Sequence, residues 1–314
     1  MNKMIYSIEP VFEERIWGTQ EIRERFGYET DLENIAEVYN VVGQKDHLDN
    51  FVTEAGMYLS DFYKQNKELF DCECKDMPVM VCMAFSDSFL SIQIHPDDEY
   101  GMLHEGGHGR PEGWVIYDGP ENNDLILGHN AQTKEEFVEL SNQRDWNKLI
   151  RHVNMKRETQ YVHVPAGSLH AFCKDALAIA FSTNGDITYR LYDYDRVDTK
   201  TGKLRPLHVQ QVFDCIKVPD LLSPYDVKPE QKEGYKHTLY YDNPGEYTCG
   251  RLQIENKCTI DEPKFMFYTC ASGKGTIGGR EIKAGETLFV PAGFGKVDLS
   301  GEMDLVYITY KSAK

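Results

Sequence analysis

Short hydrophobic runs, separated by Gly, Pro, Asn and Asp, dominate the chain between about residues 80 and 191. Within a run, apolar residues alternate with polar ones or follow one another for a few positions, which is the pattern of β-strands. The runs are 79–85, 89–95, 114–117, 125–127, 161–164, 177–182 and 188–191. Closely spaced strands with turn residues between them predict an antiparallel sandwich or barrel, so we expect a mainly β fold.

Two segments have the spacing of helices instead. Residues 56–70 place apolar side chains near helical periodicity, and residues 133–153 begin with a capping box formed by Thr133 and Glu136. The apolar positions of both segments are most simply explained as contacts with the core. We therefore expect a few helices added to the β fold.

The chain also repeats itself. The tetrapeptide VPAG at 164–167 recurs at 290–293, each time after a strand-like run. Between the two copies, residues 218–234 gather prolines and charges with little periodicity. We expect two related β-barrel domains: residues 1–217, with the added helices, and residues 235–314, joined by a linker over 218–234.

The net charge of the chain restricts the kinds of molecule that it can bind. The formal net charge is −17, which argues against nucleic acid and against an anionic membrane surface, because both require a basic face. If the substrate is an anion, the site must gather positive charge locally.

The first ten residues lack the basic and apolar regions of a secretory signal, and no apolar run approaches the roughly 20 residues that span a bilayer. The eight cysteines form no CxxC pair and are expected to be reduced thiols. These features predict a cytoplasmic protein.

Four residues form a candidate metal site. Gln93 and His95 are two positions apart, so on a strand they point to the same side. His170 follows the turn-forming sequence PAGSL, and Glu112 lies between these segments, next to the strand at 114–117. One amide, one carboxylate and two imidazoles suit zinc or another first-row divalent ion, with positions left for water or substrate.

These residues lie in motifs that resemble the type I mannose-6-phosphate isomerases, also called phosphomannose isomerases, in their short bacterial form. The resemblance extends over most of the chain. The matching runs are RIWGT at 15–19, LSIQIHPDDEY at 90–100, RPEGW at 110–114, VPAGSLHAF at 164–172 and DITYRLYDYDR at 186–196.

The resemblance implies two cupin-type (jelly-roll) β-barrels, a zinc ion, and the interconversion of mannose 6-phosphate and fructose 6-phosphate. By position, the family's metal ligands match the four residues named above, and an active-site arginine of the family matches Arg190. Arg110 and Asp186 are expected to contact the substrate. The second barrel has Lys296 where the first has His170, so it is expected to pack against the first without binding metal.

Three positions depart from the family's pattern. Cys82 and Arg110 replace lysines, and Ala180 replaces a glutamate that is a candidate base in the family. Arg110 can still bind an oxyanion, although with a different geometry from lysine. The base would then come from Asp186, from His163 or from the loop at 104–108.

Three functions therefore remain open at this stage. The first is a divergent mannose-6-phosphate isomerase. The second is a metal-dependent isomerase of another sugar, with or without a phosphate. The third is a non-catalytic sugar-binding or regulatory protein on the same scaffold. In all three the partner is a small sugar or sugar phosphate. Arg190 also has an alternative role, as a member of a structural ion pair.

Overall fold

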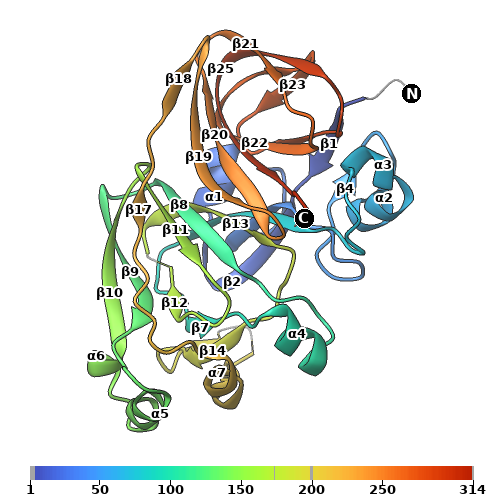
Figure 1. Ribbon diagram of the computed structural model, residues 1–314. Helices are drawn as coiled ribbons and strands as arrows, with labels where there is room; N and C mark the ends of the chain where they lie inside the picture. The colour runs from blue at the N-terminus through green and yellow to red at the C-terminus, as the bar shows by residue number, and fades with distance from the viewer. Residues whose placement is uncertain (1–3, 173, 199–200, 313–314) are drawn as a thin grey trace.

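A computed structural model describes residues 4–172, 174–198 and 201–312 of the chain, and the mainly β class is confirmed (Figure 1). The described residues form three large sheets and one short hairpin. The hairpin pairs β15 (Val197–Asp198) with β16 (Lys203–Leu204). The strand expected at 89–95 is shorter than predicted, because pairing is restricted to Ile92–Ile94.

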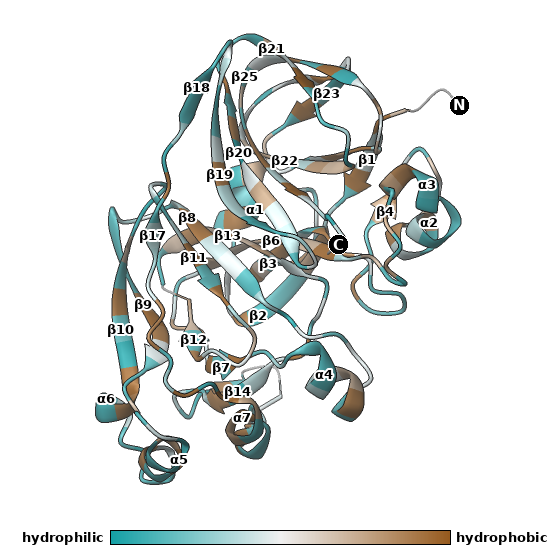
Figure 2. Cartoon of the chain, viewed as in Figure 1, coloured by the Kyte–Doolittle hydropathy of each residue, from teal (hydrophilic) through white to brown (hydrophobic). Residues whose placement is uncertain are grey.

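A seven-stranded sheet lies in the middle of the molecule, in the order β17-β11-β8-β13-β6-β3-β2. Its strands are β2 (Val11–Thr19), β3 (Ile35–Val41), β6 (Val79–Ser86), β8 (Glu112–Asp118), β11 (Gln160–Val164), β13 (Ala176–Thr183) and β17 (Tyr225–Asp226). β6 and β13 are hydrophobic along most of their length (Figure 2), as expected of strands that are covered on both faces.

The two faces of this sheet have different partners. On β13, Leu177, Ile179 and Phe181 pack into a core shared with the C-terminal part of the chain. The alternate residues point the other way, toward a five-stranded sheet. Its order is β10-β9-β12-β7-β14. Its strands are β7 (Ile92–Ile94), β9 (Asn122–His129), β10 (Ile150–Lys156), β12 (His170–Ala171) and β14 (Tyr189–Tyr192).

The third sheet has eleven strands and contains the C-terminal part of the chain. Its strands are β1 (Tyr6–Glu9), β4 (Phe51–Val52), β5 (Met57–Tyr58), β18 (Glu230–Lys232), β19 (Tyr235–Asn243), β20 (Tyr247–Ile254), β21 (Lys257–Asp261), β22 (Met266–Ile277), β23 (Arg280–Lys283), β24 (Thr287–Val290) and β25 (Lys296–Thr309). The N-terminal strand β1 pairs with β24, so the start of the chain joins this sheet (Figure 1). The division into domains at 1–217 and 235–314 stays a prediction.

Seven helices are described outside the sheets: α1 (Glu21–Phe26), α2 (Leu59–Gln65), α3 (Lys67–Phe70), α4 (Asp98–His104), α5 (Lys134–Asn142), α6 (Trp146–Leu149) and α7 (Val209–Cys215). Side chains of α5, α6 and α7 cover the outer face of the five-stranded sheet, where Phe137, Leu149 and Val212 pack against Ile92 and Ile94. None of the helices in the described part of the chain is long and apolar enough to cross a membrane.

Helices form within both segments predicted to be helical, but they are shorter than predicted. Thr133 caps α5 as expected, because its Oγ accepts a hydrogen bond from the Glu136 backbone N–H at 3.2 Å. Residues 150–153 are not helical, since they pair with β9 as part of β10. In 56–70, the helical region begins at Leu59 and is divided into α2 and α3.

The segment 218–234 packs against the rest of the chain as it connects the two parts. Asp220 is buried, and its backbone pairs with that of His129 in an isolated antiparallel β-bridge. Further along the segment, β17 pairs with β11. The Asp220 carboxylate accepts a hydrogen bond from the backbone N–H of Leu169 at 2.9 Å. This segment therefore supports the turn that precedes His170.

The repeated VPAG sequence forms the same turn twice. In the first copy the Gly167 N–H donates to the His95 carbonyl, and in the second the Gly293 N–H donates to the Pro263 carbonyl, each at 2.7 Å. Both glycines have a positive φ, at 80° and 59°, which favours glycine. The first turn leads into β12 at His170 and the second into β25 at Lys296.

Candidate metal centre

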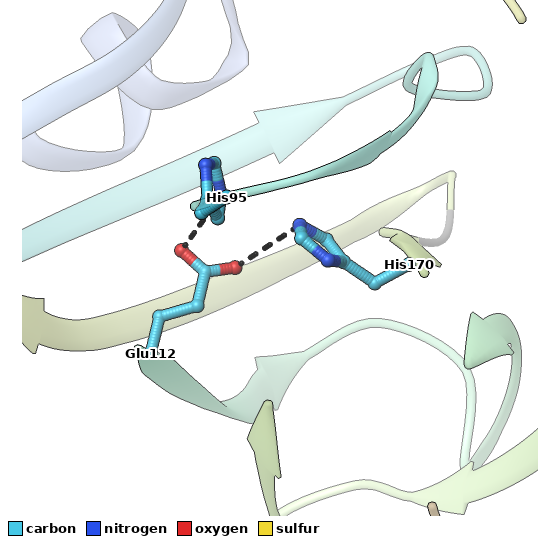
Figure 3. Close-up of side chains that lie close together, drawn as sticks. All are labelled: His95, Glu112 and His170. Carbon is cyan, nitrogen blue, oxygen red and sulfur yellow. Dashed lines mark ion pairs between the residues drawn. The ribbon is translucent and has the colours of Figure 1, made fainter. Parts of the chain in front are cut away.

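Three side chains with metal-binding atoms meet between the two sheets of the N-terminal part. His95 follows β7 and His170 begins β12, both in the five-stranded sheet, whereas Glu112 begins β8 in the seven-stranded sheet. All three are buried, and their potential ligand atoms lie within 4.8 Å of one another (Figure 3). Each histidine Nε2 is 3.5 Å from one of the two Glu112 oxygens.

Backbone carbonyls hold both histidines in the orientation of metal ligands. His95 Nδ1 lies 2.8 Å from the Ile187 carbonyl, and His170 Nδ1 lies 3.0 Å from the Ser168 carbonyl. A carbonyl only accepts, so Nδ1 carries the proton in each ring and Nε2 presents a lone pair. His170 Nε2 is buried and has no hydrogen-bond partner among the described residues. This group fits a divalent metal ion, which would give that nitrogen a partner.

Glu112 is kept ionised and in place by its neighbours. Burial alone would raise the pKa of Glu112, but the Arg110 guanidinium and the two histidines hold it well below its usual range. Burial lowers the pKa of His170 to about 4, so this ring is neutral at pH 7. A carboxylate and a neutral imidazole are the protonation states that metal coordination needs.

Gln93 lies beside this group, as the spacing of Gln93 and His95 predicts. In the five-stranded sheet Gln93 is opposite His170 on one side and opposite Arg190 on the other. Its side chain lines the same cavity as the three buried ligand-type residues. Its role as a fourth ligand stays a prediction.

A cavity of about 760 Å³ opens in front of this group, between the two sheets. That is the size range of small-molecule sites. The cavity brings together every site residue predicted from the sequence: Gln93, His95, Arg110, Glu112, His170, Asp186 and Arg190. It also contains residues that the sequence alone did not single out as functional: Arg15, Glu37, Tyr39, Arg205 and His208. Arg15 belongs to the RIWGT motif, but the other four stand in no recognisable local pattern.

Arg190 lacks the structural ion pair that was its alternative role. Among the described residues no carboxylate lies within 4.0 Å of its guanidinium, and its Nε is buried without a hydrogen-bond partner. Its side chain donates a long hydrogen bond, 3.4 Å from Nη1 to the Pro206 carbonyl. Burial and the nearby Arg205 guanidinium lower the pKa of Arg190, although an arginine stays charged. Arg190 is thus a cation available to a ligand.

Arg110 and Asp186 already contact protein groups. Arg110 Nε lies 3.1 Å from Glu112 Oε2, and its Nη1 lies 3.7 Å from Asp186 Oδ1. Asp186 also lies 2.8 Å from the exposed His47 ring. Both residues line the cavity, and their contact with substrate stays a prediction.

Of the bases expected in place of Ala180, Asp186 is the one that lines the cavity. His163 packs on Tyr241, with 4.3 Å between ring centroids, where the first part of the chain meets β19. His104 stacks on Tyr100 at 4.0 Å, and His108 contacts Asp98 at 3.6 Å. None of these three histidines is part of the cavity wall in the described structure.

No protein-family model matches the chain, but individual proteins do. GmuF of Bacillus subtilis (strain 168), named a probable mannose-6-phosphate isomerase, is 34% identical over 312 residues, which cover 95% of this chain and 97% of GmuF. The mannose-6-phosphate isomerase ManA of the same strain is 33% identical over 95% of this chain and 96% of its own length. The chain belongs to the mannose-6-phosphate isomerase family.

The fold of this isomerase family member agrees with that assignment. The crystal structure of the mannose 6-phosphate isomerase from Bacillus subtilis superposes with a TM-score of 0.90 at 29% identity, over 97% of this chain and 99% of that one. The cupin-type β fold that the resemblance implied is therefore confirmed.

Two of the three departures from the family's pattern turn out to be neighbours in this isomerase. Cys82 on β6 and Ala180 on β13 lie directly opposite each other, although they are distant in the sequence. The third departure, Arg110, lies beside the metal-binding group. All three line the cavity, so the changes fall on its wall.

Proposed function

We propose that the protein is a metal-dependent aldose–ketose isomerase that interconverts mannose 6-phosphate and fructose 6-phosphate. The observation that carries this proposal is the buried His95–Glu112–His170 group, with Arg190 in the same cavity and without a carboxylate partner among the described residues. The family to which the chain belongs supports the same reaction.

In this proposal Gln93, His95, Glu112 and His170 hold the ion. A set of two imidazoles, one carboxylate and one amide suits zinc or another first-row divalent ion, with an open position for substrate. The ion in this proposal is zinc. When bound, the ion supplies positive charge beside the sugar oxygens that become anionic as the enediol forms. Trp114 and the two backbone carbonyls keep the protein ligands oriented.

Arg190 acts at a developing or permanent negative charge of the substrate. It is separated from His170 by Gln93 alone in the strand order β14-β7-β12, so their backbones are roughly 10 Å apart. That separation suits an open-chain sugar phosphate with one end at the metal ligands.

Arg110 and Asp186 contact the sugar in this proposal. The proton that moves between C2 and C1 needs a base within hydrogen-bond reach of the reacting carbons. Asp186 takes this role, because Ala180 cannot accept a proton and the expected histidines lie outside the cavity wall.

Arg190 also offers a partner for a phosphate. Four arginines line the cavity, Arg15, Arg110, Arg190 and Arg205, but five carboxylates line it as well, and Arg15, Arg110 and Arg205 are each paired with a carboxylate. Arg190 has no such partner among the described residues, so its guanidinium is the one of the four that is left to bind an anion. A cytoplasmic location, where sugar phosphates occur, is part of the proposal.

The experiment is an isomerase assay on protein of known metal content. The protein is stripped with a chelator, reloaded with zinc and supplied with mannose 6-phosphate, and fructose 6-phosphate is measured in a coupled assay. We expect activity that depends on zinc and is lost in Glu112→Gln. One zinc per chain without fructose 6-phosphate would contradict the proposal, and would favour an isomerase of another sugar or a non-catalytic sugar-binding protein.

A further inference from the structure

One tyrosine on the cavity wall has a hydroxyl without a protein partner. Tyr39 is 1% exposed and lines the cavity. Its backbone carbonyl accepts a hydrogen bond from Asn50 Nδ2 at 2.9 Å, and its strand pairs with β2 and β6. In the described part of the chain, no group hydrogen-bonds the phenol oxygen. A buried tyrosine hydroxyl normally has a partner, so this one indicates a ligand.

The fold holds the Tyr39 ring in one place. The ring packs in a small core with Val42, Leu48 and Met80. On β3 Tyr39 lies directly opposite Cys82 of β6, and directly opposed residues in an antiparallel sheet point to the same side. Cys82 also lines the cavity. The hydroxyl is therefore in position before a ligand arrives, and binding costs little side-chain entropy.

The groups that act on the phenol show that its hydroxyl faces the cavity. Burial raises the pKa of Tyr39 well above its usual range, and the Glu37 carboxylate, the Cys82 thiol and the Asp186 carboxylate raise it further. The Arg110 guanidinium lowers it. All four of these neighbours line the cavity. Tyr39 thus keeps its proton, and its O–H group can both donate and accept.

The same neighbours select the kind of ligand atom. Two carboxylates and one guanidinium act on the phenol, from Glu37, Asp186 and Arg110, so its surroundings are negative in sum. A phosphate placed there would be repelled. A sugar hydroxyl is neutral, and it can pair with the phenol O–H as donor or acceptor. The anionic end of the substrate is left to Arg190, which has no described carboxylate partner.

Tyr39 lies along the cavity from the metal-binding group. Trp114, Ala180, Cys82 and Tyr39 are cross-strand neighbours on β8, β13, β6 and β3, in that order. Three strand spacings separate the backbones of Trp114 and Tyr39 by about 14 Å. The two side chains between them are short. A ligand that extends from the metal-binding group can therefore pass over Ala180 and Cys82 and reach the Tyr39 hydroxyl.

We propose that Tyr39 determines specificity by hydrogen-bonding the hydroxyl on C3 or C4 of the open-chain sugar phosphate. This inference rests on the proposed function, in which the metal-binding group takes the C1–C2 end and Arg190 takes the phosphate on C6. The Tyr39 hydroxyl then contacts the part of the carbon chain between those ends. It favours a sugar that carries a hydroxyl there over the deoxy analogue.

The test compares wild type and Tyr39→Phe, which removes one oxygen atom and keeps the ring. For mannose 6-phosphate, kcat/KM of the zinc-loaded enzyme should fall by about 10-fold, because one uncharged hydrogen bond is lost. For the 3-deoxy or the 4-deoxy analogue, the same substitution should change kcat/KM by less than about 2-fold, because that analogue lacks the partner hydroxyl. No loss on the parent sugar, or an equal loss on the parent and both analogues, would overturn the inference.

Two further measurements separate this role from a structural one. Thermal unfolding and zinc content of Tyr39→Phe should match wild type, because no hydrogen bond within the described protein is lost. Tyr268→Phe is the matched control, since Tyr268 is 2% exposed in the C-terminal core and is not part of the described cavity wall. It should leave kcat/KM unchanged for all three sugars. A lower melting temperature in Tyr39→Phe, with equal losses on all three sugars, would assign the hydroxyl to the fold instead.

Failure of this inference is distinguishable from failure of the proposed function. If mannose 6-phosphate is turned over equally by wild type and Tyr39→Phe, the isomerase stands and Tyr39 has no such role. If no sugar phosphate is turned over, binding of the three sugars to both zinc-loaded proteins is measured by calorimetry. A dissociation constant that rises by about 10-fold in Tyr39→Phe for the parent, and not for one deoxy analogue, supports the contact. Unchanged or absent binding overturns it.

Discussion

The indole N–H of Trp114 donates a hydrogen bond to Oε1 of Glu112, with 2.8 Å between nitrogen and oxygen. The two residues are two positions apart on β8, so both side chains point into the cavity between the sheets. The bond fixes the carboxylate while its two oxygens face the two histidines. Outer contacts of this kind orient a metal ligand and strengthen its binding to the ion.

Trp114→Phe should therefore weaken metal binding while leaving a ring in place. Loss of an outer-shell partner typically costs about 10–100-fold in metal affinity. The measurement is competition for zinc with a chromophoric chelator. The control is Trp146→Phe, because Trp146 stacks on Tyr192 at 4.6 Å and is not part of the cavity wall described above. Equal affinities in the two variants would contradict the role of the Trp114–Glu112 hydrogen bond.

His170→Ala should abolish tight metal binding. The variant removes a ligand-type nitrogen of the metal-binding group that is buried without a hydrogen-bond partner among the described residues, so zinc affinity should fall by more than the roughly 10–100-fold expected for an outer contact. Metal content after dialysis, measured by mass spectrometry, checks the result. His152→Ala is the matched control, since His152 is exposed and contacts only Asp124 among the described charged groups. A full zinc complement in His170→Ala would exclude this residue as a ligand.

Arg190→Ala should reduce turnover and leave the fold intact. The guanidinium has no described carboxylate partner, so its loss breaks no ion pair, and removing one stabilising group of an anionic transition state costs about 10²–10³ in kcat. Steady-state kinetics and thermal unfolding are measured together. Arg144→Ala serves as the control, because Arg144 is exposed and pairs with Asp195 at 2.7 Å. A large drop in melting temperature in Arg190→Ala would indicate a structural role instead.

Asp220 should make the stability of the protein depend on pH. Burial raises the pKa of Asp220 from 3.8 to about 6. The folded state then holds the proton more tightly than the unfolded state. The contribution of protonated Asp220 to the free energy of unfolding is therefore complete below about pH 4 and is lost as the pH rises through about 6. The shift corresponds to at most about 3 kcal/mol in the free energy of unfolding.

Asp220→Asn should remove this dependence. From pH 4.5 to pH 7.5, the free energy of unfolding of the variant should rise by about 2 kcal/mol relative to that of wild type, because wild type alone buries a charge at the higher pH. Urea unfolding of both proteins in the presence of a chelator gives the comparison. Asp226→Asn, exposed on the same segment, is the control. A difference between Asp220→Asn and wild type that stays constant with pH would show that Asp220 does not titrate in this range.

Features that depend on near neighbours in the chain were predictable. Gln93 and His95 face one cavity because side chains two apart on a strand share a side. The VPAG turn repeats because proline and glycine set the backbone locally, and Thr133 caps α5 because its hydroxyl reaches an N–H three residues away. The mainly β class follows from the same local patterns.

Features that depend on strand pairing could not be predicted from the sequence. Residues 150–153 have helical spacing, yet they form part of β10 because β9 supplies their hydrogen bonds. Asp220 stands in a stretch with the composition of a linker, yet it is buried beneath the turn before His170. In both cases distant residues outweigh the local preference.

The sequence by itself was enough to predict the candidate metal-binding residues and to determine the family and the β class, because these depend on short motifs and on a period of two. Only the tertiary structure decided what surrounds them. The register of β6 and β13 brings Cys82 opposite Ala180, and the packing of two sheets brings Tyr39 and Glu37 into a cavity with Arg190. Register and sheet packing are set by burial over the whole chain, so no single segment contains them.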